Sequence, residues 1–145
     1  MDYIKSKVDG SLLHIINRKE EITARTNVCP DDEFLQLATM KMPLGMTFKP
    51  HKHIYKDGPK EVIAQESWIV IEGKVKVILY DIDDTIIHED VIFPGDCSIT
   101  FKGGHNYEIL EDDTIVYEYK TGPYQGIEMD KDFIWWKLLK ILKML

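Results

Sequence analysis

Short apolar runs separated by turn residues constrain the fold of this chain more than any other feature. From Lys74 to Tyr80 lysine alternates with valine before an apolar end, which is the period of a strand with one buried face. Thr85 to Phe93 returns after the turn Asp81 to Asp84, and this predicts an antiparallel hairpin. Similar runs recur at intervals of roughly 8 to 12 residues with almost no helix signal, a spacing typical of sandwiches and barrels. We therefore predict an all-β domain of roughly ten short strands.

The remaining strands follow from the same signals. Tyr3 to Val8 and Leu12 to Ile16 flank Asp9-Gly10, a dipeptide that favours a tight turn, so the chain is expected to begin with a hairpin. Tyr107 to Leu110 and Thr114 to Lys120 are expected to form the last pair of strands, divided by an acidic turn. Single strands are expected at Glu33 to Met42 and at Cys97 to Phe101.

Two histidines stand one residue apart near the middle of the chain. His51 and His53 alternate with Lys52, so in a strand both imidazoles point to one face and the lysine to the other. Glu66 opens a second apolar run, and if that strand lies beside the first, its carboxylate joins the two imidazoles. His105 begins a third run after two glycines and can add a fourth ligand. Imidazole and carboxylate bind divalent metals; the alternative is a set of surface and turn histidines with a solvated glutamate.

The spacing of these residues resembles the two conserved motifs of the cupins, over about residues 35 to 120. The first motif is matched by Gly45, His51, His53, Glu66 and Gly73. The second is matched in part by Pro94, Gly95, Asp96 and His105. The resemblance implies a double-stranded β-helix, a jelly-roll barrel, in which His51, His53, Glu66 and His105 hold a divalent metal ion (Fe, Mn, Ni, Zn or Co). Among cupins the chain looks most like the small single-domain proteins of bacterial surface-polysaccharide and sugar metabolism.

The chain departs from the family pattern in two places. The connection from His53 to Glu66 is longer than in cupins and has the composition of a loop, so we expect an insertion at the mouth of the barrel. In the second motif Phe101 replaces a proline, the spacing to His105 is one residue shorter, and Ile109 stands in place of an asparagine.

Strand alternation also predicts the lining of a cavity beside the metal. The residues expected on the same faces as the ligands, and therefore expected to bind a substrate, are Lys49, Tyr55, Trp68 and Tyr107. A lysine near the metal would favour an anionic ligand such as a carboxylate or a phosphate. Apart from the ligands, no residue stands out in the sequence as a general base, and no catalytic residue is assigned.

Three nitrogens and one carboxylate hold a metal ion while leaving one or two coordination positions open. The sequence therefore predicts a metal-dependent enzyme that acts on a small polar substrate, a sugar or an organic acid. An isomerase, an epimerase and an oxygenase are all compatible with these residues. The alternative is a non-catalytic module that binds or senses a small ligand and docks through its C-terminal helix.

Charge and cysteine content limit the partners and the compartment. The net charge of −7 disfavours nucleic acid, because phosphate binding needs a basic surface. Cys29 and Cys97 lie far apart and have no CxxC spacing, which favours a reducing, cytoplasmic location. The first thirty residues contain no signal-like apolar run, and no segment reaches the roughly 20 apolar residues that span a bilayer.

The last residues are expected to form a tail of their own, residues 127–145, after a barrel domain of residues 1–126. From Phe133 to Leu145 apolar residues are interrupted only by Lys137, Lys140 and Lys143, which predicts an amphipathic helix with a wide apolar arc. That arc is expected to pack on the barrel or across a subunit interface, and we predict a homodimer. The alternative is peripheral contact of residues 133–145 with an anionic membrane surface.

Overall fold

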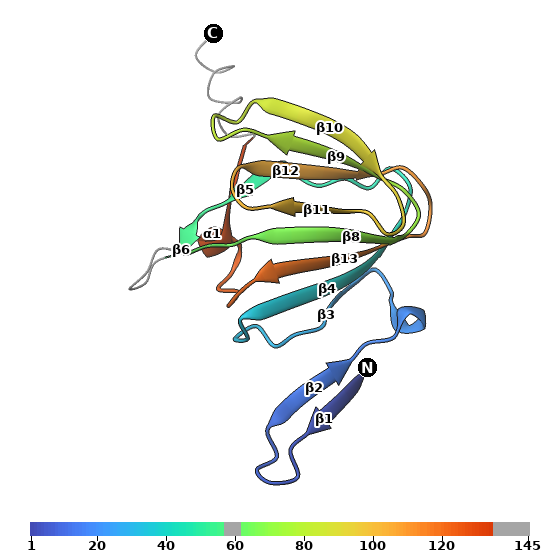
Figure 1. Ribbon diagram of the computed structural model, residues 1–145, viewed down its shortest axis with the longest axis vertical. Helices are drawn as coiled ribbons and strands as arrows, with labels where there is room; N and C mark the ends of the chain where they lie inside the picture. Colours follow the sequence, from blue (N-terminus) through green and yellow to red (C-terminus); the bar gives the residue numbers. More distant parts are fainter. Residues whose placement is uncertain (57–61, 135–145) are drawn as a thin grey trace.

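The computed structural model describes residues 1–56 and 62–134 of the chain. Within these residues two five-stranded antiparallel sheets form a barrel, and two small two-stranded sheets stand outside it (Figure 1). The strands are β1 (Asp2–Lys5), β2 (Leu12–Ile16), β3 (Arg25–Asn27), β4 (Leu35–Met42), β5 (His51–His53), β6 (Tyr55–Lys56), β7 (Val62–Ile63), β8 (Glu66–Glu72), β9 (Val75–Tyr80), β10 (Ile86–Ile92), β11 (Cys97–Thr100), β12 (Gly104–Ile109), β13 (Thr114–Thr121) and β14 (Lys131–Phe133). A 3₁₀ turn at Lys19–Glu21 and the short helix α1 (Ile127–Asp130) complete the described elements.

Each large sheet combines strands that are distant in the sequence. The histidine sheet, which carries His51, His53 and His105, has the strand order β10-β9-β12-β5-β14. The glutamate sheet, which carries Glu66, has the order β11-β8-β13-β4-β3. The chain therefore passes repeatedly between the two sheets, as in a jelly roll, and the all-β architecture predicted from the sequence is confirmed.

Side chains from both sheets meet in one core. In β8 the side chains of Glu66, Trp68 and Val70 are buried and those between them are more exposed, as strand alternation predicts. Trp68 stacks on Tyr107 of β12, with ring centroids 3.8 Å apart and planes inclined by 6°. The other members of the core are Met40, Met42, Val75, Val77, Ile109 and Val116. Because burying one such large side chain contributes about 1.5–3 kcal/mol, this contact between the sheets is a main source of stability.

Two predicted hairpins are confirmed and one predicted strand pair is wrong. β1 pairs with β2, and β9 pairs with β10. The expected last pair, β12 and β13, is divided between the sheets: β12 pairs with β9 and β5, whereas β13 pairs with β8 and β4. The acidic turn between them carries the chain from one sheet to the other. Periodicity identifies a strand and its buried face, but it does not identify the neighbouring strand.

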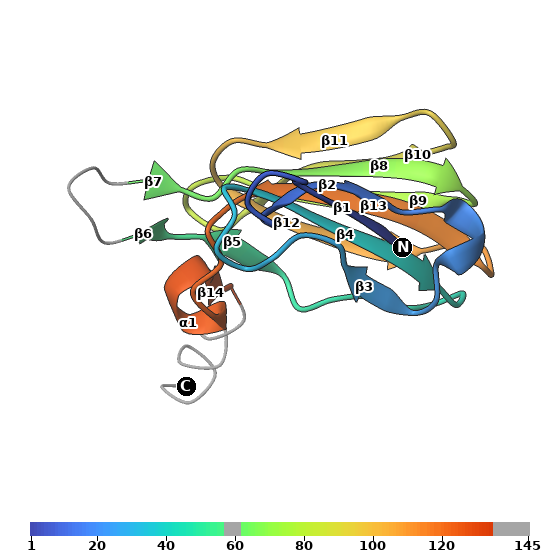
Figure 2. The same cartoon turned by 90° about the horizontal axis from the view of Figure 1, so that it is seen from below.

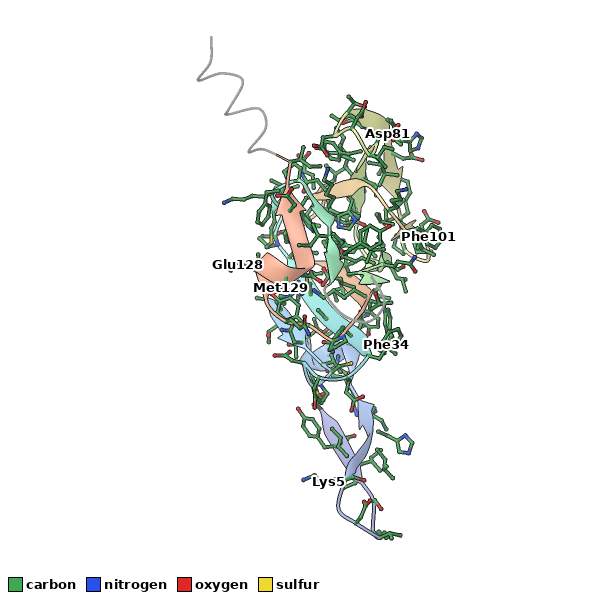
Figure 3. All side chains as sticks on the ribbon, turned by 90° about the vertical axis from the view of Figure 1, so that its left-hand side faces the viewer. Lys5, Phe34, Asp81, Phe101, Glu128 and Met129 are labelled. Atoms are coloured by element: carbon green, nitrogen blue, oxygen red, sulfur yellow. The ribbon has the colours of Figure 1, made fainter. Side chains whose placement is uncertain are left out.

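The N-terminal hairpin of β1 and β2 extends beyond the glutamate sheet (Figures 1 and 3). In Figure 3, Lys5 on this hairpin lies at one end of the molecule and Asp81 lies at the other. Two exposed ion pairs join the hairpin to the segment that follows it: the Met1 amino group lies 2.7 Å from Glu21, and Arg18 lies 2.9 Å from Asp2.

The last described residues join the histidine sheet. After α1, strand β14 pairs with β5, so that Lys131 lies opposite His53 and Phe133 lies opposite His51. Figure 2 shows α1 and β14 together on one side of the barrel. The amphipathic helix was predicted to begin at Phe133, but Phe133 lies in a strand, and residues 135–145 of the predicted helix lie outside the described residues. In the described part of the chain, no helix has the length and apolar content needed to cross a bilayer.

Gly73, between β8 and β9, is expected to tolerate no side chain. Its φ is 87°, and a Cβ there would lie 2.1 Å from Thr114 Oγ1. Gly95 has a φ of 92° but open space around it. A left-handed backbone costs a residue with a side chain about 1–2 kcal/mol, and overpacking adds about 1–3 kcal/mol. We expect Gly73→Ala to lower the free energy of unfolding in urea by about 2–5 kcal/mol and Gly95→Ala, the control, by about 1–2 kcal/mol. Equal losses would contradict the clash with Thr114.

Candidate metal centre

Four potential metal ligands come from three strands of the two sheets. His51 and His53 lie on β5, and His105 lies opposite His51 on the neighbouring strand β12. Glu66 is the first residue of β8, in the other sheet. Strand β8 therefore faces β5 across the barrel, rather than lying beside it as the sequence analysis supposed. All four side chains are buried, so they meet inside the barrel and away from bulk water.

The ligand atoms of these four residues converge on one point. One nitrogen from each histidine and one carboxylate oxygen all lie within 4.8 Å of one another. His53 Nε2 is 3.0 Å from Glu66 Oε2, and His105 Nε2 is 3.4 Å from Glu66 Oε1. The Nε2 atoms of His51 and His105 are 3.3 Å apart. An ion about 2.0–2.2 Å from each ligand separates its ligands by roughly 3–4.4 Å, so this donor set fits a metal ion with only a small closure of the widest pair.

Each imidazole is held in place through its other ring nitrogen. His51 Nδ1 donates to the carbonyl oxygen of Lys49 over 2.9 Å, and His105 Nδ1 is 2.9 Å from the hydroxyl of Thr100. His53 Nδ1 is 3.2 Å from the carbonyl oxygen of Asp130 and 3.3 Å from its carboxylate. Partners of this kind fix the orientation of a ligating histidine and direct its Nε2 at the metal position.

Two of the histidines are held neutral by their surroundings. Burial lowers the pKa of His51 to about 3, with the nearby charge of Lys131 as the next cause. Burial also lowers the pKa of His105 to about 4, although the charge of Glu66 opposes this shift. Because a neutral imidazole carries the lone pair that binds a metal, both residues are ready to act as ligands at neutral pH.

His53 behaves differently because it lies between two carboxylates. Burial alone would lower its pKa, but hydrogen bonds and ion pairs with Asp130 and Glu66 outweigh burial and raise the pKa to about 9. Burial would likewise raise the pKa of Glu66, but its electrostatic interaction with the nearby His105 ring and its hydrogen bond with the charged His53 hold that pKa well below its usual range. The pKa of Asp130 is also held low: burial opposes the shift, and the hydrogen bond with His53 outweighs it. In the metal-free protein His53 is therefore an imidazolium between two carboxylates.

A cavity of about 240 Å³ lies beside this cluster. His51 and Glu66 form part of its wall, together with the aromatic side chains of Phe48, Trp68 and Tyr107. The other charged residues in the wall are Arg25, Asp31, Glu118, Lys120 and Lys131. Pockets that hold drug-sized molecules run to about 300–1,000 Å³, so this one suits a single small molecule.

Trp68 connects Glu66 to a second buried carboxylate in the cavity wall. The indole Nε1 donates to Glu66 Oε1 over 3.0 Å and to Glu118 Oε2 over 3.2 Å. The other oxygen of Glu118 accepts from Arg25 Nη2 over 2.8 Å. Tyr107, which packs on Trp68, has its pKa raised far above the usual value by burial, so its hydroxyl stays neutral and bonds to Ser98.

Of the residues expected to bind a substrate, Trp68 and Tyr107 lie in the cavity wall, whereas Lys49 and Tyr55 do not. Lys49 is exposed and stands over the ring of Phe133, with its Nζ 5.9 Å from the ring centroid. Tyr55 is 53% exposed and belongs to β6. The structure places these two residues outside the cavity because β5 contains only residues 51–53, and alternation does not continue beyond the ends of a strand.

The structure brings in residues that the sequence analysis did not assign to the site. Glu118 and Lys120 lie on β13, and Asp130 and Lys131 lie at the junction of α1 and β14. Figure 3 shows Glu128 and Met129 on the outside of α1, whereas Asp130, at the end of the same helix, is fully buried. For Glu118 and Lys120 the signal was present, since they share a face of β13 with the core residue Val116. Asp130 carried no such signal.

No family model matches the sequence, and no curated protein matches it. Among solved structures, the chain is similar to KdgF from Halomonas sp., with 20% identity and a TM-score of 0.55, over 70% of this chain and 80% of that one. It is also similar to the capsular polysaccharide assembling protein CapF from Staphylococcus aureus, with 18% identity and a TM-score of 0.62. That match covers 88% of this chain but 36% of CapF.

A third similar structure is a conserved protein with a double-stranded β-helix domain from Klebsiella pneumoniae. Its identity to this chain is 12% and its TM-score is 0.58, over 83% of this chain and 96% of that one. At these levels of identity the likeness establishes the fold. The two facing antiparallel sheets and the buried cluster of histidines and glutamate agree with that likeness. The chain therefore has a double-stranded β-helix fold, as the resemblance of its motifs to those of the cupins implied.

Proposed function

We propose that this protein binds a divalent metal ion through His51, His53, Glu66 and His105 and acts on a small polar molecule in the adjacent cavity. One observation carries the proposal: three imidazole nitrogens and a carboxylate oxygen, all buried, lie within 4.8 Å of one another. Burying so many polar groups at one point is costly unless they are paired or coordinate a metal. The hydrogen bonds on the far side of each imidazole support the same assignment.

A bound divalent ion would supply a Lewis acid or, for iron or manganese, a redox centre. The chain itself provides the other functions of a catalytic site. Trp68 and Tyr107 exclude water from one side of the cavity. Glu118 is a buried carboxylate in the cavity wall outside the ligand set, and it can accept or return a proton at its Oε atoms. An isomerase, an epimerase or an oxygenase would use a site with these parts.

The substrate is proposed to be a sugar or an organic acid. The charged residues in the wall suit a polar molecule, and the volume of about 240 Å³ suits a small one. The name of CapF, of which the match covers 36%, refers to capsular polysaccharide assembly and supports a sugar-related role.

A non-catalytic role, in which the cavity binds or senses a small ligand, is the second candidate. The observation that favours it concerns Glu118, because both of its oxygens already accept hydrogen bonds, one from Arg25 and one from Trp68. A carboxylate held in this way is less available as a base. Turnover of a candidate sugar or acid by the metal-loaded protein, abolished by Glu118→Gln, would decide for the enzyme.

The cellular setting is also a proposal. Cys29 and Cys97 are both free thiols, which supports a cytoplasmic location. A homodimer, and peripheral membrane contact through residues 133–145, stay predictions, since most of that segment lies outside the described residues.

Loss of one ligand is expected to abolish metal binding. We expect the wild-type protein to bind close to one equivalent of Zn²⁺, Mn²⁺, Fe²⁺, Ni²⁺ or Co²⁺ by elemental analysis, and His51→Ala to bind none. An ion at one hundred times its dissociation constant stabilises the native state by about 2.7 kcal/mol, so the melting temperature of the wild type should rise when metal is added. The melting temperature of His51→Ala should not respond.

His88→Ala is the matched control, because the His88 side chain is 59% exposed and lies outside the cluster. Its metal content and its thermal response should equal those of the wild type. A wild-type protein without bound metal, or a His51→Ala variant that keeps its metal, would contradict the proposed function.

Metal binding is expected to release about one proton at neutral pH. His53 has its pKa raised to about 9, so it is charged in the metal-free protein, and it must lose that proton to bind the ion. The apparent affinity should therefore rise with pH, by about tenfold per unit, and level off near pH 9. Calorimetry in two buffers of different ionisation enthalpy measures the proton release. Asp130→Asn, which removes a carboxylate that raises this pKa, should reduce the release and move the plateau to lower pH.

A further inference from the structure

Two lysines occupy the wall of the cavity that contains His51 and Glu66. Lys120 comes from β13 of the glutamate sheet and Lys131 from β14 of the histidine sheet, so they reach the cavity from opposite layers of the barrel. The inference drawn from these two lysines rests on the function proposed above. It extends that function to the chemical class of the ligand.

Lys120 is held in place although it is almost buried. Its side chain is 11% exposed, and its Nζ lies 3.4 Å from Asp130 Oδ2 and 4.4 Å above the centroid of the Tyr124 ring. Lysine is rarely buried to this extent unless its charge has a partner. The ammonium group has three N–H donors, and the carboxylate of Asp130 accepts one of them. Further donors are therefore available for a ligand in the cavity.

Lys131 brings a second positive charge close to the metal position. It is half-buried and lies opposite His53 in the pairing of β14 with β5. The next residue, Asp132, is exposed, as strand alternation requires when Lys131 faces inward. Lys131 and His51 both line the cavity, so the lysine and a metal ligand face the same space.

The other charges in the wall are already compensated or lie at the surface. Arg25 and Glu118 form an ion pair with 2.8 Å between Nη2 and Oε1. Asp31 is exposed, and Glu66 belongs to the ligand cluster. Gln36 uses its amide to donate to the carbonyl oxygens of Pro30 and Glu33, so it anchors a loop. Lys120 and Lys131 are therefore the cationic donors best placed for a ligand.

We propose that the natural ligand carries an anionic oxygen group, a carboxylate or a phosphate, that Lys120 and Lys131 bind while the rest of the molecule reaches the metal ligands. The aromatic wall of Trp68 and Tyr107 limits that molecule to a small one. The binding of an anionic ligand, which the sequence suggested for Lys49, is thus assigned to Lys120 on β13 and Lys131 on β14.

Three probes with one carbon skeleton test this proposal: gluconate, sorbitol 6-phosphate and the neutral sorbitol. Binding of each to Co²⁺-loaded protein is measured by calorimetry, and uptake of Co²⁺ is followed separately by its visible absorption. We expect gluconate or sorbitol 6-phosphate to bind at least about tenfold more tightly than sorbitol, and Lys131→Gln and Lys120→Gln each to remove about tenfold or more of that affinity. Neither variant should alter the stoichiometry of Co²⁺. The anion that binds more tightly identifies the group as a carboxylate, if it is gluconate, or as a phosphate, if it is sorbitol 6-phosphate.

Lys49→Gln is the matched control, since it removes an equal charge near the site but outside the cavity, and it should leave the affinity for both anions unchanged. Lys131→Gln retains the Lys120–Asp130 pair, so the test does not depend on whether Lys120→Gln folds.

Equal binding of the anions and sorbitol, binding of no anion, or anion affinity that survives both lysine variants would overturn the proposal. A chain that takes up no Co²⁺ contradicts the proposed function instead. The anions are then measured on the metal-free protein, where a lysine-dependent preference supports the anion site and its absence overturns it.

Discussion

The ion pair between His53 and Glu66 joins the two sheets at the centre of the barrel. Burying two charges costs several kcal/mol each unless the remaining polar atoms are satisfied. Here Asp130 binds the other nitrogen of His53, and the Trp68 indole donates to the other oxygen of Glu66. These partners come from α1 and from the core, so the site and the packing of the barrel depend on the same contacts.

Much of this arrangement could be predicted from the sequence, because it depends on local periodicity. Alternation identified His51, His53, Trp68 and Tyr107 as inward-facing, and the structure confirms their burial. What periodicity could not give is the partner of each strand. The pairing of β14 with β5, which brings Asp130 to His53, joins residues 77 positions apart and has no local signal. The same limitation led to the wrong pairing of β12 with β13.

Asp130 lies between the proposed metal site and the cavity lysine Lys120. Its carboxylate lies 3.3 Å from His53 Nδ1 and 3.4 Å from Lys120 Nζ, so one group orients a metal ligand and a cavity lysine together. A change in the charge of either neighbour acts on the other through this carboxylate. Metal occupancy and binding of an anion are therefore expected to influence each other, and by thermodynamic linkage the influence is equal in both directions.

The division of the ligands between the layers, with three histidines on one sheet and Glu66 on the other, has a mechanical consequence. An ion shared by these residues ties together His51 and His105, which are 54 positions apart, and fastens their layer to the opposite one. Because the four ligands converge only in the folded barrel, such an ion binds the native state and not the unfolded chain, and it stabilises the contact between the layers. The ion would also oppose any sliding of one sheet over the other. It would therefore stabilise the barrel in addition to its proposed role in catalysis.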